Sequence, residues 1–165
     1  MVEDIVSNRI VKVTKPGLFG AQGEDAGNYI LRWALHNLAF NSDVTLEGIV
    51  TFPGEHSPRA VISQPFVFGR DATSDEQTDF LKERGFHEVE SGRWVHPVRG
   101  FVVWDTITPG NAIMTDEGVV PIDYQIDHAS TQELNRVRQQ TGIGKNTSFS
   151  ISNDPPLPSL NRRDP

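Results

Sequence analysis

Cysteine is absent from the 165-residue sequence, which excludes disulfide frameworks, zinc sites with cysteine ligands and thiol catalysis. Long apolar runs are absent too, since no stretch approaches the ~20 apolar residues that a membrane-spanning helix needs. The chain begins with an acidic stretch that includes Glu3 and Asp4, rather than with the basic and apolar regions of a secretory signal. We therefore expect a cytoplasmic protein that makes no membrane contact.

Positive charge is scarce, with 15 Lys and Arg residues against 22 Asp and Glu residues and a net charge of −7. A nucleic-acid surface requires clustered basic residues, so nucleic-acid binding is not expected. No pattern in the sequence specifies an oligomeric state.

Apolar residues make up 36% of the chain and include three Trp and nine Phe, enough for one modest core. Residues 1–141 contain all the periodic segments and are expected to form a single domain. Residues 142–165 are rich in Ser, Asn and Pro, and this composition predicts a disordered tail.

Short apolar or alternating segments separated by turn residues predict mainly antiparallel strands. The expected hairpins pair residues 2–6 with 9–14, residues 44–52 with 59–64, the two halves of 87–98, and residues 112–114 with 118–122, while residues 100–104 form a further buried strand. Together with the helices below, these strands predict an α+β fold.

Three helices are expected. The first spans residues 24–40, with Ala26, Ile30, Ala34 and Leu38 on one buried face that Leu31 and Leu35 widen. The second begins at a capping box, formed by Thr73 with Glu76 or by Ser74 with Gln77, and ends at Gly85. The third is capped by Ser130 and Glu133 and runs to about Gln140.

The segment from Trp104 to Asp123 is the best candidate for chemistry. Asp105 leaves a buried strand, Asn111 follows a Pro-Gly turn, and Asp123 ends the last hairpin. Singly, each is typical of turn residues. Together their side-chain oxygens suit Mg²⁺, a hard ion commonly held by carboxylates and substrate phosphates.

Lys12 lies within an apolar strand, where a charged side chain needs a partner. An edge-strand lysine pointing to water is the alternative. The glycine-rich loop of residues 17–27 matches no phosphate-binding fingerprint, and the five His residues show no metal-ligand spacing.

The chain resembles the serine/threonine/tyrosine kinase-like domain of polyvalent proteins from phages and mobile elements. The matching stretches occur in kinase order over about residues 9–126: 9–17, 35–37, 47–48, 63–67, 109–111 and 121–123. This resemblance implies a reduced protein-kinase-like fold, in which an antiparallel sheet and an αC-like helix precede a minimal C-terminal part. It also implies that ATP and Mg²⁺ are cofactors.

The same resemblance assigns roles to individual residues. Lys12 would hold the nucleotide phosphates, and Asn111 and Asp123 would hold Mg²⁺. The carbonyl of Gln64 and the N–H of Phe66 would contact adenine. Asp105 and Lys12 would be the catalytic residues, with Asp105 orienting or deprotonating a substrate hydroxyl.

The sequence also departs from the kinase pattern. Asp105 precedes Asn111 by six residues instead of five, which leaves Thr106 at the usual position of the base. No Glu lies in the middle of the first helix to pair with Lys12, and no full glycine-rich hairpin precedes Lys12. We expect an ATP- and Mg²⁺-dependent phosphotransferase acting on a protein; a catalytically inactive pseudokinase that binds a nucleotide or a partner is the alternative.

Overall fold

A computed structural model describes residues 2–4, 8–20 and 25–142 of the chain. Within these residues the protein is α+β, with three antiparallel sheets and three helices, as the sequence predicts. The predicted tail lies outside the described residues from residue 143 onward, and so does Glu24 at the expected start of the first helix. None of the helices in the described ranges has the length and apolar character needed to cross a membrane.

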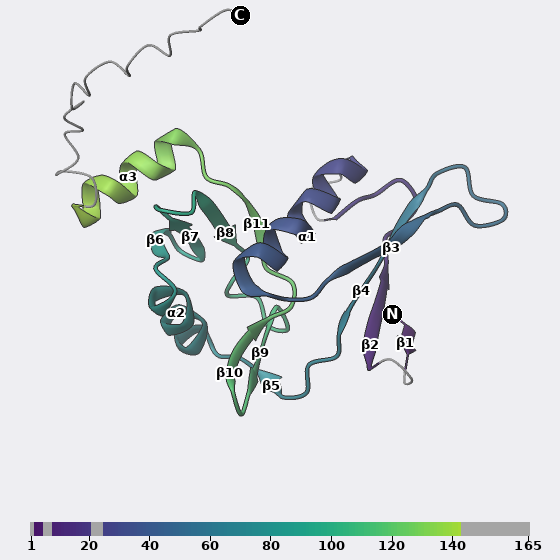
Figure 1. Cartoon of the computed structure of the whole chain (residues 1–165), viewed down its shortest axis with the longest axis horizontal. Helices are drawn as coiled ribbons and strands as arrows, with labels where there is room; N and C mark the ends of the chain where they lie inside the picture. Colours follow the sequence, from purple (N-terminus) through teal and green to yellow (C-terminus); the bar gives the residue numbers. More distant parts are fainter. Residues whose placement is uncertain (1, 5–7, 21–24, 143–165) are drawn as a thin grey trace, which may run out of the picture.

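The first sheet has the strand order β1-β2-β4-β3 (Figure 1). Its strands are β1 (Val2–Asp4), β2 (Arg9–Val13), β3 (Thr45–Val50) and β4 (Arg59–Pro65). Both predicted hairpins of this region are present, and β2 pairs with β4 in a register that places Lys12 opposite Ile62. Because β2 lies between two other strands, the alternative of Lys12 on a sheet edge is wrong.

The remaining strands form two further sheets. One has the order β11-β8-β7-β6 and the other β10-β9-β5. Their strands are β5 (Arg70–Asp71), β6 (His87–Glu90), β7 (Arg93–His96), β8 (Phe101–Trp104), β9 (Ala112–Thr115), β10 (Gly118–Pro121) and β11 (Gln125–His128). The hairpins β6–β7 and β9–β10 and the strand β8 are confirmed predictions, whereas the short strands β5 and β11 were not predicted.

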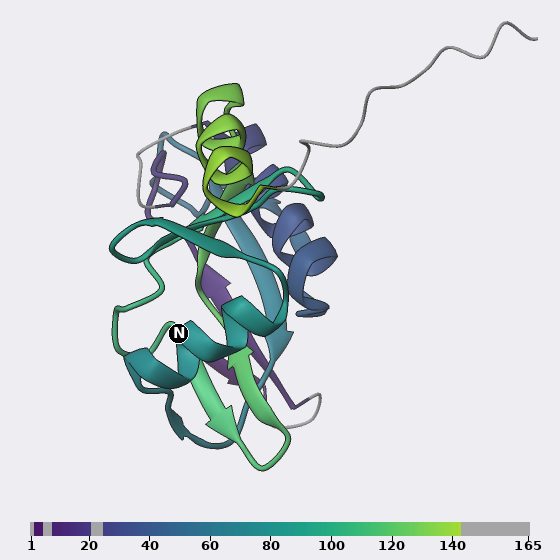
Figure 2. The same cartoon turned by 90° about the vertical axis from the view of Figure 1, so that its left-hand side faces the viewer.

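Helices α2 and α3 begin at the residues that the capping patterns indicate. The helix α2 (Ser74–Glu83) uses Thr73 and Glu76 as a reciprocal capping box, so the alternative of Ser74 with Gln77 is wrong. The helix α3 (Thr131–Thr141) uses Ser130 and Glu133 in the same way. Figure 2 shows α3 above the β6–β7 hairpin and α2 beside the β9–β10 hairpin, in agreement with their contacts.

The helix α1 (Ala26–Phe40) lies between the first sheet and the remainder of the protein (Figure 1). Asp25 caps its first turn by accepting the backbone N–H of Asn28 at 2.9 Å. Its predicted buried face is right for Leu35, which is buried, but wrong for Ala34 and Leu38, which are exposed, the latter to 63%. Tyr29, Trp33 and His36 are buried instead. The buried stripe therefore follows the aromatic residues rather than the small aliphatic ones.

Two apolar clusters meet on α1 and explain this difference. Tyr29 and Trp33 pack with Val44, Ala60 and Ile62 against the first sheet. On another side, Leu35 joins the main core formed by α2 and the strands of the second half. The helix is thus the element that fixes the first sheet relative to β8 and β11.

A third cluster holds α3 in place. Val137 of α3 is fully buried against Val89, Val95 and Val102 of the β11-β8-β7-β6 sheet. Glu133 strengthens this attachment because its carboxylate accepts two hydrogen bonds from Arg93 of β7, at 2.9 and 2.7 Å. The helix α3 is therefore packed onto the β11-β8-β7-β6 sheet.

Candidate functional site

A cleft of about 460 Å³ opens between the first sheet, α1 and the loops that follow β8 and β10. Five charged side chains line it: Lys12, Lys15, Arg32, Asp105 and Asp123. Three of them, Lys12, Asp105 and Asp123, are residues for which the sequence predicts a role. The fold brings them together although 110 residues separate Lys12 from Ile122 in the chain.

Lys12 reaches the cleft from the interior strand β2. Its ammonium group lies 3.8 Å from a carboxylate oxygen of Asp123, 3.4 Å from the carbonyl oxygen of Ile122 and 5.3 Å from the centroid of the Trp33 ring. Burial lowers the pKa of Lys12, the charge of Asp123 raises it, and Arg32 lowers it. The sequence predicts that Lys12 needs a charged partner, and this partner is Asp123. It takes the place of the glutamate that the first helix lacks.

Asp123 sits at the end of the β9–β10 hairpin, between two cations. One carboxylate oxygen faces Lys12, and the other lies 3.2 Å from Nη2 of Arg32 on α1. Its backbone N–H and that of Ile122 donate to the carbonyl oxygen of Asn111, at 3.1 and 2.9 Å. The next residue, Tyr124, is fully buried and donates its hydroxyl to Gln77, which anchors the chain beyond the site.

Asp105 occupies a left-handed backbone conformation, with φ of +60°, directly after β8. Residues other than glycine seldom adopt this region, and such positions often occur at functional sites. Its carbonyl oxygen accepts the side-chain amide of Asn111 at 2.9 Å, and its carboxylate accepts the hydroxyl of Thr108. The loop therefore holds the Asp105 carboxylate at the cleft, where it accepts a hydrogen bond from a hydroxyl group.

Thr106 does not fill the position of a base. It is 1% exposed, and its hydroxyl donates to the carbonyl oxygen of Gly92 at 3.3 Å, away from the residues that line the cleft. Of the two residues, Asp105 and not Thr106 therefore lines the cleft.

The predicted metal ligands Asn111 and Asp123 are neighbours through the hydrogen bonds of the Asn111 carbonyl. No group of three or more His, Asp or Glu residues gathers as a metal site among the residues that the structure describes. A carboxylate and an amide oxygen fit Mg²⁺ when substrate phosphates supply further ligands, because this ion is commonly held by one or two carboxylates and the substrate. Asn111 does not line the cleft, however, and its side-chain amide donates to the carbonyl oxygen of Asp105, so Asp123 is the predicted ligand that lines it. With one carboxylate at the cleft, the donor set fits an ion that nucleotide phosphates also hold better than an ion held by protein alone.

The predicted adenine contacts are not brought into the cleft. Gln64 and Phe66 do not line it, and the N–H of Phe66 donates to the carbonyl oxygen of Asn8 at 2.9 Å. Gln64 is 3% exposed within β4, and its side-chain oxygen is buried without a hydrogen-bond partner. The Phe66 N–H therefore forms its hydrogen bond with the first hairpin instead of facing the cleft.

Arg32 is the site residue that the sequence analysis missed. The sequence analysis found no Glu in the middle of the first helix to pair with Lys12. The helix carries Arg32 instead, and this cation pairs with Asp123. A signal was present, because Tyr29, Arg32, Trp33 and His36 follow one another at helical spacing i, i+3, i+4 and i+7. Choosing the aliphatic stripe as the buried face placed Arg32 on the wrong side of the helix.

Comparison with known proteins gave one family. A family model described as "Serine/Threonine/Tyrosine Kinase found in polyvalent proteins" matches residues 7–129, which include β2, α1, the cleft and both loops that carry its carboxylates. No curated protein and no solved structure matches the chain.

Proposed function

Since the chain belongs to the serine/threonine/tyrosine kinases found in polyvalent proteins, we propose that its cleft binds ATP with Mg²⁺ and transfers the terminal phosphoryl group to a protein hydroxyl. The observation that carries this proposal is the convergence of Lys12, Asp105 and Asp123 on one cleft. Phosphoryl transfer depends mainly on positioning and on neutralising charge, and these residues supply a cation and two carboxylates for that purpose.

Each residue has a defined task in this reaction. Lys12 binds phosphate oxygens of the nucleotide, and Asp105 receives the proton of the acceptor hydroxyl. The acceptor oxygen forms a bond to the terminal phosphorus, the bond from this phosphorus to the bridging oxygen breaks, and ADP leaves. Asn111 and Asp123 would hold Mg²⁺, which when bound neutralises part of the phosphate charge.

The hydrogen bond between Thr108 and Asp105 supports the role given to Asp105. A hydroxyl group of this chain already donates a hydrogen bond to the carboxylate, which supports the proposal that the carboxylate accepts a proton from a substrate hydroxyl. An incoming Ser, Thr or Tyr side chain would take the place of Thr108 at this oxygen. We also propose that the adenine ring contacts Gln64 and Phe66 only after the hydrogen bond from the Phe66 N–H to the Asn8 carbonyl oxygen breaks.

Calorimetry with ATP, with and without Mg²⁺, tests the site, and transfer of labelled phosphate to the chain or to a test protein tests catalysis. We expect Asp123→Asn to remove the Mg²⁺-dependent part of ATP binding, because the amide is a weaker ligand for a hard cation. Asp105→Asn should leave ATP binding intact and reduce transfer by ~10²-fold or more, the scale of lost general-base catalysis.

Asp43→Asn is the matched control, because it breaks a carboxylate–arginine pair between the loop before β3 and Arg9 of β2, at 2.8 Å, away from the cleft. This variant should bind ATP like the wild type. Unchanged Mg²⁺-dependent binding in Asp123→Asn would refute the assignment of Asp123, and unchanged transfer in Asp105→Asn would refute that of Asp105.

An inactive nucleotide- or partner-binding module is the second candidate. It is favoured by the pairing of both Asp123 carboxylate oxygens with cations and by the commitment of the Phe66 N–H to Asn8. This alternative predicts ATP binding that does not depend on Mg²⁺, or no ATP binding, together with no phosphate transfer. The same calorimetric and transfer measurements separate it from the first candidate.

A further inference from the structure

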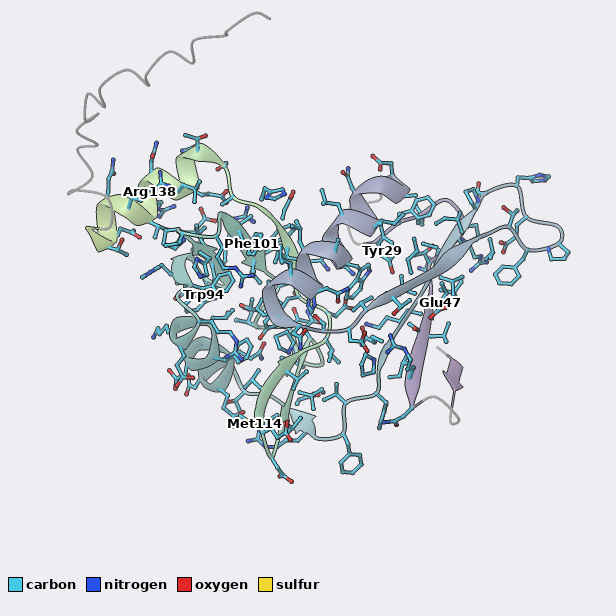
Figure 3. The ribbon with its side chains drawn as sticks, viewed as in Figure 1. Tyr29, Glu47, Trp94, Phe101, Met114 and Arg138 are labelled. Atoms are coloured by element: carbon cyan, nitrogen blue, oxygen red, sulfur yellow. The ribbon has the colours of Figure 1, made fainter. Side chains whose placement is uncertain are left out.

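Arg32 is held at the cleft more firmly than a surface arginine. It projects from the middle of α1, its side chain is 13% exposed, and its guanidinium carbon lies 4.2 Å from the centroid of the Trp33 ring and 5.4 Å from that of Tyr29. Tyr29 is on the side of α1 that faces the first sheet (Figure 3). Such aromatic contacts favour a charged guanidinium and restrict its movement.

The protein does not use all of the hydrogen-bonding capacity of Arg32. Its Nη2 pairs with Asp123 at 3.2 Å, while its Nε is buried without a hydrogen-bond partner. A buried donor without a partner is unfavourable. The guanidinium therefore has more N–H donors than the protein supplies acceptors for. Arg32 lines the cleft that Lys12 and Asp123 also line.

The charges of the cleft favour an anion. Lys12, Lys15 and Arg32 contribute three positive charges to its lining, against two negative charges from Asp105 and Asp123. An arginine fork matches the oxygen geometry of a phosphate group as well as that of a carboxylate. However, one carboxylate oxygen of Asp123 cannot form a full ion pair with Arg32 and also ligate a divalent cation, so the two interactions compete.

We propose that Arg32 is a second phosphate-binding residue of the cleft, and that it exchanges its ion pair with Asp123 for nucleotide phosphate oxygens when Asp123 binds a divalent cation. This inference rests on the proposed function and gives the helix cation a role in it. Without nucleotide, Arg32 neutralises Asp123 and weakens metal binding. With nucleotide, the freed guanidinium adds to the charge that Lys12 presents to the phosphates.

Two affinities should therefore change in opposite directions in Arg32→Gln, which removes the charge and keeps the length of the side chain. ATP binding in the presence of saturating Mg²⁺, where Asp123 is on the cation and Arg32 is free for the phosphates, should weaken by about tenfold, the scale of a lost hydrogen bond to a charged group. Binding of Mn²⁺ alone, which prefers the same oxygen ligands as Mg²⁺, should strengthen by about threefold, the scale of a partly exposed ion pair. Both are measured by calorimetry.

Arg32→Lys provides a second variant that keeps the charge, in case the glutamine variant does not fold. It should bind Mn²⁺ as the wild type does and ATP more weakly than the wild type, because an ammonium lacks the fork. Arg93→Gln is the matched control: Arg93 also pairs with a carboxylate, of Glu133, and lies 5.1 Å from the Trp104 ring centroid, but it does not line the cleft. Both affinities should be unchanged in this control.

The outcomes separate this inference from the function on which it rests. If the wild type binds ATP with Mg²⁺ but both affinities of Arg32→Gln equal those of the wild type, the role of Arg32 is refuted and the nucleotide site stands. Weaker ATP binding without stronger Mn²⁺ binding refutes the exchange of partners. If the wild type binds no ATP under any condition, the proposed function is refuted, and this inference with it.

Discussion

At the scale of single residues, His36 shows how burial sets a chemical property. It is fully buried on α1, its Nδ1 contacts the hydroxyl of Ser42, and its Nε2 has no hydrogen-bond partner. The Ser42 hydroxyl also lies 3.1 Å from the carbonyl oxygen of His36 and donates its proton there, so Nδ1 carries the ring proton. Protonating Nε2 would bury a charged donor without a partner.

A stability measurement tests this environment. Burial, followed by the charges of Arg32 and Lys12, lowers the pKa of His36 from 6.5 to about 3. The unfolded chain therefore binds one more proton than the folded chain between pH 6.5 and pH 3, so stability falls as the pH falls through this range. From pH 7 to pH 5, this residue should reduce the free energy of unfolding by about 2 kcal/mol.

His36→Gln removes the titrating group and keeps a side chain that can form hydrogen bonds. Urea unfolding at pH 7 and pH 5 should show the wild type losing about 2 kcal/mol more than this variant over that interval. The comparison uses the difference between two pH values, so a uniform loss of stability in the variant does not affect it. Equal losses in the two proteins would contradict the assigned environment.

At this scale, the sequence could predict properties that neighbouring residues determine, but not contacts between distant segments. That Lys12 needs a partner follows from one strand, but that its partner is Asp123 depends on two segments that only the tertiary fold brings together. The extra residue after Asp105 was visible in the sequence, but its effect was not. The left-handed conformation of Asp105 and the burial of Thr106 decide which side chain lines the cleft.

At the scale of elements, local signals were most successful where the residues of an element specify its own ends. The capping boxes of α2 and α3 and the turns of the hairpins are of this kind. The strand β5 was missed because two residues give no periodicity, and β11 was missed because Ile126 is its one apolar residue; pairing with β9 and β8 stabilises them instead. The buried face of α1 was only partly right because this helix packs on two sides, which a single stripe does not describe.

The start of α2 allows a direct test of the two capping patterns that the sequence offered. Thr73 accepts the N–H of Glu76 at 3.3 Å, and the Glu76 carboxylate accepts the N–H of Thr73 at 2.9 Å. Thr73→Ala should therefore reduce the free energy of unfolding by about 1 kcal/mol. Ser74→Ala, at the neighbouring exposed position, should change it by less than about 0.5 kcal/mol. Chemical denaturation measures both, and a reversed order would mean that Ser74 rather than Thr73 is the N-cap of α2.

At the scale of the whole molecule, a short linker joins the two halves between β4 and β5 (Figure 1). Gly69 in this linker packs against β9 so closely that a Cβ atom there would lie 2.3 Å from the carbonyl oxygen of Met114 and 2.6 Å from a side-chain carbon of Ile113. The first of these neighbours is backbone and cannot turn away. The position of the linker against β9 therefore requires glycine.

Gly69→Ala should force the linker and β9 apart. Overpacking of this kind typically costs about 2 kcal/mol, which for a chain of this size lowers Tm by roughly 6 °C. Differential scanning calorimetry measures the change. A variant that melts with the wild type would show that the linker does not pack on β9 in solution.

The placement of the cleft has a consequence for protein synthesis. Lys12 and Arg32 leave the ribosome well before Asp123, because 91 residues separate Arg32 from Asp123, and α1 packs against β11, which follows Asp123. Domains generally fold as units during translation, so α1 is made long before the strand and the carboxylate that complete its surroundings. A nascent chain shorter than this point holds two cations without their counter-charge. Because of this order of synthesis, the cleft is among the last parts of the domain to form.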